Sequence, residues 1–279
     1  MDAKSDSERL ENIKNRRYVL NITINHVEVQ VTLDTGSTDL WVMPPSGLGT
    51  FNNTGIPINL CYGDGAYGTS GTIGVSPFNL GAYTVERQAF MRATTSTIGG
   101  LQEDGIYGVM GLGFDSIMIS PINQKIRSLY GQNATWGRSV MRNIFAQDPN
   151  IPHFFGIDLS RTGDLEDTVG GTFTIGEHDQ RFAGIADEPK LFQFPKGAYR
   201  WTTLFESISV DGMAIPLHSV NPGVPSGRAV AVLDTGEPNS VLPAHIFDAI
   251  YSRIPGSALY DNPSQRRAYG SFHATQQQA

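Results

Sequence analysis

Short apolar segments separated by turn residues run along most of the chain, and they predict a mainly β protein. Apolar and polar residues alternate over residues 27–33, a period of two that predicts a half-buried strand ending at Asp34. The unbroken apolar run of residues 229–233 predicts a strand that is buried on both faces and ends at Asp234. Turn residues are frequent between such segments, because the chain contains 31 Gly and 16 Pro.

Two short helices are expected among the strands. The first begins at Ser120-Pro121 and ends at Gly131, with one apolar face made of Ile122, Ile126 and Leu129. The second begins at Pro243, and its apolar stripe consists of Ile246, Phe247, Ile250, Tyr251 and Ile254.

The most informative motif is a repeat. Asp34-Thr35-Gly36 and Asp234-Thr235-Gly236 stand 200 positions apart, and each follows a predicted strand directly. Two similar strand-to-loop units indicate a duplicated, two-lobed molecule in which each lobe contributes one aspartate. Two carboxyls that share one proton can supply both a base that activates water and an acid that protonates a carbonyl oxygen. Their titrations belong to the pair and not to either residue alone.

The sequence around this repeat resembles a known family. Residues 34–42 (DTGSTDLWV) are similar to the first active-site loop of the pepsin-like aspartic proteases. Residues 58–75 resemble the flap hairpin of that family, residues 108–114 the segment under the first aspartate loop, and residues 201–212 the strand pair that opens the second lobe. The resemblance runs from Tyr18 to the end of the chain.

The resemblance implies a fold and a set of roles. The fold is a bilobal, mainly β, pepsin-like acid protease fold with an active-site cleft between two related β-barrel-like lobes. The implied catalytic residues are Asp34 and Asp234. The implied flap and substrate-binding residues are Tyr62, Gly63, Asp64 and Gly65. The residues that support the catalytic pair are Thr35, Gly36, Ser37, Thr235 and Gly236, and the two threonines hold the two loops in register.

Two aromatic residues each allow two interpretations. Tyr62 is either a cross-strand aromatic in a hairpin or the tyrosine of a flap that closes over a bound peptide. Trp41 is either a core aromatic or a donor whose indole N–H points toward that tyrosine.

The resemblance also divides the chain. Residues 18–165 are expected to form the first lobe with the flap, and residues 166–279 the second. Only about 45 residues follow Asp234, fewer than the family needs, so the second lobe is expected to be incomplete. Residues 1–17 are rich in charge and lack the apolar core of a secretion signal, and they are expected to form a solvated polar arm.

One residue departs from the family pattern. Glu237 stands where a serine or threonine normally donates a hydrogen bond to the second catalytic carboxylate, as Ser37 can do for Asp34. An ionised glutamate cannot donate, and it adds a negative charge near the pair. The alternative to an aspartic-type endopeptidase is therefore a catalytically inactive homologue that binds peptides. A homodimeric protease of the retroviral kind needs one Asp-Thr-Gly per chain and is disfavoured by the second copy.

Composition excludes several other classes. The net charge of −7 and a pI near 5.3 argue against nucleic acid and anionic membrane surfaces as partners. No run approaches the roughly 18 apolar residues of a membrane span. A monomer with a polypeptide substrate is expected. The family resemblance implies a secreted or vacuolar protein.

No cofactor and no metal are predicted. The six histidines are dispersed without metal-ligand spacing. Cys61 is the single cysteine, and it is expected to be a small buried residue of a strand. Residues 63–68 (GDGAYG) fit a dinucleotide-binding pattern, but a strand-like run follows them where that motif requires a helix, so a hairpin tip is expected. No Gly-x-Ser-x-Gly motif is present for a serine hydrolase.

Overall fold

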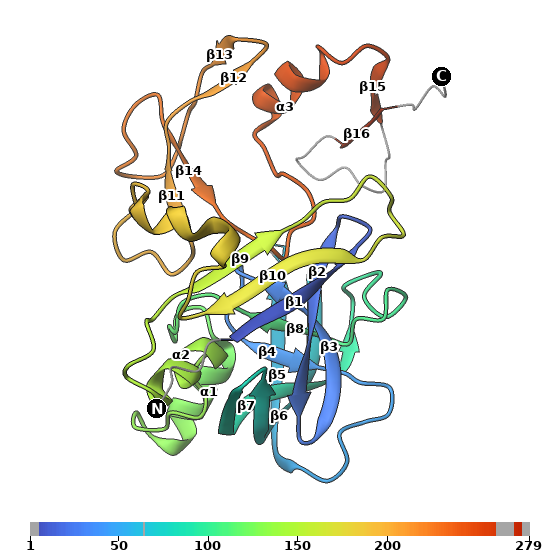
Figure 1. Ribbon diagram of the computed structural model, residues 1–279, viewed down its shortest axis with the longest axis vertical. Coiled ribbons are helices and arrows are strands. Elements are labelled where there is room, and N and C mark those ends of the chain that lie inside the picture. Colours follow the sequence, from blue (N-terminus) through green and yellow to red (C-terminus); the bar gives the residue numbers. More distant parts are fainter. Residues whose placement is uncertain (1–5, 64, 261–270, 275–279) are drawn as a thin grey trace. The chain divides into compact units, whose positions relative to one another are not determined.

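The computed structural model describes residues 6–63, 65–260 and 271–274. They form two compact units. The first unit holds the described residues up to Leu191 together with residues 198–201 and 232–238, and the second holds residues 192–197, 202–231 and the described residues from Asn239 onward. The predicted boundaries of the two lobes stay a prediction. The expectation of a mainly β chain is confirmed, since strands dominate both units (Figure 1).

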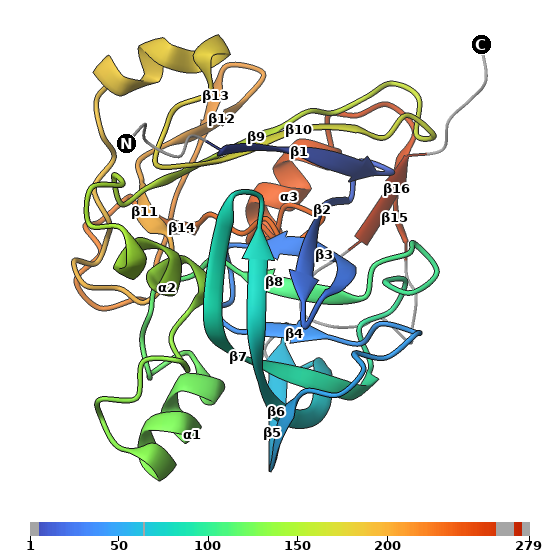
Figure 2. The same cartoon turned by 60° about the horizontal axis from the view of Figure 1, so that its bottom comes forward.

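The first unit is built on a sheet of ten strands. They are β1 Asp6–Ile13, β2 Arg17–Ile24, β3 Val27–Asp34, β4 Leu40–Val42, β5 Asn52–Tyr62, β6 Tyr67–Leu80, β7 Tyr83–Ser96, β8 Gly108–Gly111, β9 Phe155–Leu159 and β10 Val169–Ile175. Their order across the sheet is β5-β6-β7-β4-β8-β3-β2-β1-β10-β9, and β6 also pairs with β2 (Figures 1 and 2). The β3–β8 and β4–β7 pairs are parallel, and the other pairs are antiparallel.

The expected solvated arm is wrong for residues 6–13. These residues form β1, which pairs with β2 on one side and with β10 on the other. Leu10 and Asn12 are buried, whereas Arg9 and Glu11 are exposed. The charges that indicated a solvated arm therefore lie on the solvent side of a half-buried strand, where alternate residues face opposite ways.

Two α-helices contact β7 of this unit, α1 Pro121–Tyr130 and α2 Val140–Gln147. The prediction of α1 is confirmed with its ends: Ser120 is the N-cap and its side chain accepts from Asn123 N, and Gly131 is the C-cap. Leu129, expected on the apolar face, is 53% exposed. The sequence prediction missed α2, and also a 3₁₀ helix at Gln180–Asp187.

The second unit contains shorter elements. They are β11 Thr202–Phe205, β12 Ile208–Val210, β13 Met213–Ile215, β14 Ala229–Val232, α3 Ala244–Tyr251, β15 Ser257–Tyr260 and β16 Ser271–Ala274. The strands pair in twos as β11–β14, β12–β13 and β15–β16. The predicted helix after Pro243 is confirmed as α3, although only Ile246 of its apolar stripe is buried.

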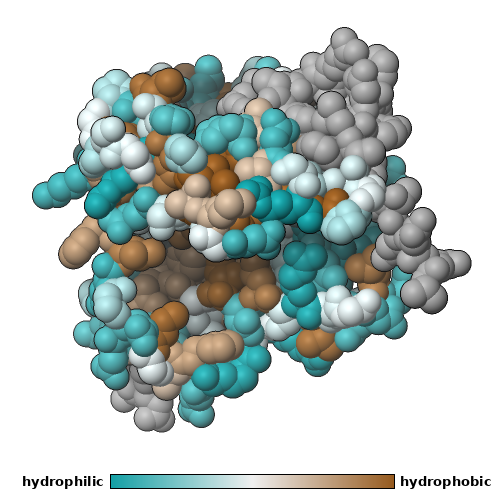
Figure 3. Space-filling model, turned by 90° about the horizontal axis from the view of Figure 1, so that it is seen from above, coloured by the Kyte–Doolittle hydropathy of each residue, from teal (hydrophilic) through white to brown (hydrophobic). Residues whose placement is uncertain are grey.

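The apolar segment 229–233 does form a strand, but the prediction that it is buried on both faces is wrong. Val232 is 49% exposed and Leu233 is 59% exposed. Within the described residues β14 pairs with a single strand, β11, so its faces are only partly covered. Other apolar side chains of this unit are also exposed, Val220 and Phe192 among them. Figure 3 shows apolar residues in brown scattered over one face of the molecule. No helix in the described part of the chain is long and apolar enough to cross a membrane.

Candidate active site

The first aspartate loop begins where β3 ends. β3 runs parallel to β8, which pairs Asp34 with Gly111, and Leu112 N donates to Asp34 O at 2.7 Å. A Cβ atom on Gly111 would lie 2.4 Å from the carbonyl carbon of Thr38. Only glycine fits at this position, and its absent side chain lets the 108–114 segment lie directly under the loop.

Hydrogen bonds join this loop to the second Asp-Thr-Gly loop, and both loops belong to the first unit. Thr35 N donates to Thr235 Oγ1 at 3.1 Å, and Thr235 N donates to Thr35 Oγ1 at 2.9 Å. Thr35 Oγ1 in turn donates to Leu233 O at 2.7 Å, and Thr235 Oγ1 donates to Leu33 O at 2.9 Å. These four bonds are of two kinds, and each kind is made in both directions, so the two loops are related by a local two-fold arrangement.

The glycines of the motif bring the carboxyls close together. A Cβ atom on Gly36 would lie 2.1 Å from Asp234 Oδ2, and one on Gly236 would lie 2.5 Å from Asp34 Oδ1. Each carboxyl therefore lies against the glycine of the other loop. A larger residue in place of either glycine would leave no room for the opposite carboxyl. The structure thus brings together the residues that the repeated motif predicted as a pair.

Asp34 is the more buried of the two aspartates. Its carboxyl accepts from Gly36 N at 2.8 Å and from the Ser37 hydroxyl. Burial is the main cause that raises the pKa of Asp34 to about 6. The adjacent Asp234 carboxyl contributes to this rise, and the hydrogen bonds from Ser37 and Gly36 oppose it. Asp234 is half-buried and accepts from Gly236 N at 2.9 Å.

The two loops differ at their fourth residue. Ser37 donates to Asp34, whereas Glu237 occupies the equivalent place after Gly236 and is exposed. An ionised glutamate cannot reproduce the bond that a serine makes.

The predicted flap forms a hairpin of β5 and β6, in which Tyr62 pairs with Tyr67. Gly63 and Gly65 at its tip have φ values of 55° and 87°, which favour glycine. Asp64 lies outside the described residues. A strand and not a helix follows the tip, so the hairpin interpretation of residues 63–68 is confirmed.

Tyr62 lies in the electrostatic field of the candidate site. Burial and the nearby carboxyls of Asp34 and Asp39 raise the pKa of Tyr62 well above its ordinary value, partly offset by the Trp41 indole and the Ser37 hydroxyl. Trp41 is 1% exposed, and its Nε1 makes no hydrogen bond with any described residue. Trp41 is therefore a core aromatic, and because its indole also lowers the pKa of Tyr62, both interpretations of Trp41 stay open.

Asp39 is a buried carboxyl that the sequence interpretation did not single out. It accepts from the Ser120 hydroxyl and from Ile122 N at 3.2 Å, and it thereby ties the first loop to the start of α1. The pKa of Asp39 is raised to about 6, mainly by burial; the hydrogen bonds from Ser120 and Ile122 oppose this rise, and the nearby Asp115 carboxyl contributes to it. The sequence does predict Ser120 as the start of a helix, but it does not indicate that Asp39 accepts a hydrogen bond from the Ser120 hydroxyl.

Two other expectations concern residues outside this pair. Cys61 is exposed, so the prediction of a buried cysteine is wrong; it lies on the solvent side of β5, where alternate residues face out. In the described ranges, no three His, Cys, Asp or Glu side chains gather in a way that could hold a metal ion.

Comparisons with known proteins match most of the chain. A family model described as eukaryotic aspartyl protease matches residues 17–265. Probable vacuolar protease A of Arthroderma benhamiae is 24% identical over 262 residues, which cover 88% of this chain and 58% of that protein. Pregnancy-associated glycoprotein 2 of Sus scrofa is 33% identical over 263 residues, which cover 88% of this chain and 55% of that protein.

A solved structure supports the fold. The aspartic proteinase from Irpex lacteus superposes with a TM-score of 0.64 at 17% identity, over 92% of this chain and 70% of that chain. The predicted mainly β, pepsin-like acid protease fold is therefore confirmed. The chain spans just over half the length of the curated relatives it matches.

Proposed function

Because the chain belongs to the eukaryotic aspartyl protease family, we propose that it is an aspartic-type endopeptidase with Asp34 and Asp234 as its catalytic pair. One observation carries the proposal. The two Asp-Thr-Gly loops exchange hydrogen bonds in both directions, and each carboxyl lies against the glycine of the other loop. An aspartate that only stabilises a turn would not need a second Asp-Thr-Gly loop beside it.

The chemistry follows from the shared proton. With one carboxyl ionised and the other protonated, the ionised one takes a proton from water as the oxygen of that water attacks the peptide carbonyl carbon. The protonated one gives its proton to the carbonyl oxygen, which forms a tetrahedral diol. The C–N bond then breaks as the amine nitrogen takes the proton that the first carboxyl received from water, and one diol hydroxyl returns its proton to the second carboxyl, which leaves a new carboxylic acid and an amine. Because the pKa of Asp34 is raised to about 6, the pair keeps one proton in acid, and we expect activity at acid pH.

The flap residues have a role in this proposal. The β5–β6 hairpin, with Tyr62 near its tip, covers an extended polypeptide and pairs with its backbone. We further propose a monomer that is secreted or vacuolar. The name of one relative, a vacuolar protease, supports the vacuolar choice.

The second candidate is a homologue that binds peptides without cleaving them. Glu237 favours it, because an ionised carboxylate cannot donate to Asp234 and adds negative charge beside the pair.

Cleavage of unfolded globin between pH 3 and 7, with and without a statine-type inhibitor, tests the first proposal. We expect inhibitable acid activity that vanishes in Asp34→Asn and in Asp234→Asn. Unchanged turnover in either variant would exclude the pair as the catalytic residues. A folded protein that is silent, and that gains turnover when Glu237→Ser is introduced, would support the second candidate. The 279-residue chain and any longer product of its gene should both be assayed, because the relatives are longer.

A further inference from the structure

Residues 116–147, which include both α1 and α2, differ in charge from the rest of the chain. They contain none of the 27 acidic residues and four of the 20 basic ones, namely Lys125, Arg127, Arg138 and Arg142. The segment therefore carries +4 in a chain whose total is −7, which leaves −11 for the remainder. We call residues 116–147 the basic segment.

The cations of the basic segment form no ion pairs with other described residues. Elsewhere in the first unit, Arg17 pairs with Asp104 at 3.1 Å and Arg181 pairs with Asp179 at 2.6 Å. In the part of the chain that the structure describes, no carboxylate forms an ion pair with any of the four cations of the basic segment. Arg127 donates its Nε to the neutral Asn123 Oδ1 at 3.1 Å. Among the described residues, the four cations of the basic segment thus have no carboxylate partner at ion-pair distance.

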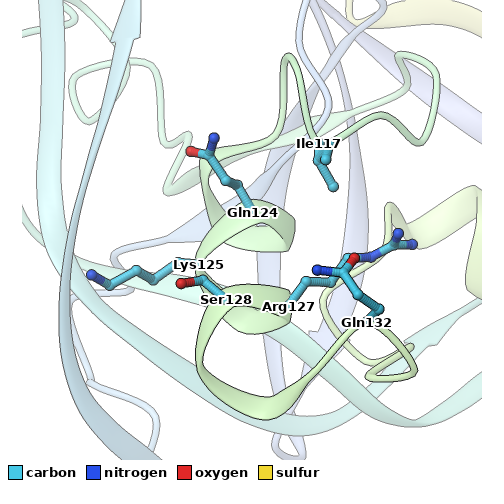
Figure 4. Close-up of a pocket in the computed structure, with 6 residues that line it drawn as sticks. All are labelled: Ile117, Gln124, Lys125, Arg127, Ser128 and Gln132. Atoms are coloured by element: carbon cyan, nitrogen blue, oxygen red, sulfur yellow. The ribbon is translucent and has the colours of Figure 1, made fainter.

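An open cavity of about 470 Å³ lies on this surface. It is lined by Ile117, Gln124, Lys125, Arg127, Ser128 and Gln132. In Figure 4, Arg127 and Gln132 lie on one side of the helix and Lys125 lies on the other, with Ser128 between them. Ile117 reaches toward the cavity from the loop that precedes α1 (Figure 4).

We propose that this cavity binds an acidic segment of a polypeptide, a segment in which Asp or Glu side chains recur. The cations on both sides of the helix suit a ligand with more than one carboxylate. The remainder of the chain carries −11, so a ligand rich in carboxylates is attracted more strongly to the basic segment than to the rest of the molecule on average.

The uncharged lining residues favour a peptide over other anions. Gln124 and Gln132 each offer an amide donor and an amide acceptor, which match the carbonyl and the N–H of a peptide backbone. Phosphate and sulfate groups offer mostly acceptors, so they match only the amide donors of these two glutamines and not their carbonyls. Ile117 supplies an apolar contact for the methylene groups of a Glu side chain.

The test measures binding of a fluorescein-labelled dodecapeptide of alternating Glu and Ser, by fluorescence anisotropy at pH 6.5 and low salt, where Glu is ionised. The control peptide has Gln in place of every Glu. We expect the acidic peptide to bind and the control peptide not to. Lys125→Glu with Arg127→Glu should weaken binding at least about tenfold, and added salt should weaken it as well.

Matched variants separate the site from the total charge. Lys190→Glu with Lys196→Glu makes the same change in net charge at two exposed residues outside the basic segment, and binding should change less than about twofold. Gln132→Ala changes no charge and should weaken binding several-fold, since it removes an amide partner of the backbone. The Asp34→Asn variant should bind the acidic peptide as the parent does. The binding test is therefore independent of the proposed protease activity.

Three results would overturn the inference. The first is no binding of the acidic peptide. The second is an equal loss of binding in the Lys125/Arg127 variant and in the Lys190/Lys196 control, which would mean that total charge alone decides binding. The third is tighter, Lys125- and Arg127-dependent binding of inorganic polyphosphate or of phosphatidylglycerol vesicles, which would assign the cavity to a different anion.

Discussion

Replacing Asp39 by Asn should reduce the pH dependence of the stability of this protein. Asp39 is 7% exposed, and its pKa of about 6 compares with an ordinary value of 3.8. Well below pH 3.8 the Asp39 carboxyl is protonated in both the folded and the unfolded chain. As the pH rises toward 6, the unfolded chain releases this proton while the folded chain keeps it, so the stability falls through this range and is lower above it.

The size of the effect follows from the two pKa values. At 1.36 kcal/mol per pKa unit, the rise from 3.8 to about 6 corresponds to about 3 kcal/mol of stability that is present at low pH and lost above pH 6. Asp34 acts in the same direction, because its pKa is also raised to about 6. Asp179 acts in the opposite direction, since hydrogen bonds from Arg181 lower its pKa. A comparison of each variant with the parent removes these other contributions.

The assay is the melting temperature of the parent and of Asp39→Asn at pH 3.5 and at pH 7. The parent should lose about 3 kcal/mol more than the variant between the two pH values, which is roughly 6 to 12 °C in a chain of this size. The control is Asp187→Asn, which removes the same charge from an exposed residue. If Asp39→Asn and this control change the pH dependence by the same amount, burial of Asp39 does not raise its pKa in the way described.

Two further substitutions test the candidate pair. Gly36→Ala places a methyl group 2.1 Å from Asp234 Oδ2, so the carboxyl must move by on the order of 1 Å, and kcat/KM on unfolded globin should fall on the order of 100-fold. Gly163→Ala, where the added methyl meets no atom within 4 Å, should leave kcat/KM unchanged, and an equal loss in both would contradict the steric reasoning. Ser37→Ala removes a hydrogen bond that lowers the pKa of Asp34, so the high-pH limb of the kcat/KM profile should move to higher pH, and a limb that moves down would refute this assignment.

Local sequence pattern was sufficient for elements whose ends are marked by side chains. The strand over residues 27–33 and the helix from Pro121 were predicted with their ends, because period-two alternation and a Ser N-cap are local signals. Burial was predicted less well. The apolar run of residues 229–233 gives no information on how many strands pack against it. The residues of β1 were expected to form a solvated arm because they are rich in charge, but these charges lie on one face of a paired strand.

The candidate site was also predicted only in part. The repeated Asp-Thr-Gly motif predicted which residues come together, since duplication is visible in the sequence. Asp39 was missed because its partners, Ser120 and Ile122, lie about 80 positions away and share no motif with it. Contacts of this kind depend on how α1 docks on the sheet, which no local pattern specifies.

Two carboxyls held against each other lower the stability of a protein, because both are desolvated and their charges repel. Here each carboxyl lies so close to the opposite glycine that a methyl group would not fit, and four hydrogen bonds keep the loops in that position. Binding a peptide requires neither the second carboxyl nor this closeness. Activation of water between two carboxyls requires both. The paired carboxyls therefore support the proposed hydrolysis over peptide binding alone. Glu237, which cannot donate a hydrogen bond when ionised, bears on how strongly the second carboxyl is stabilised.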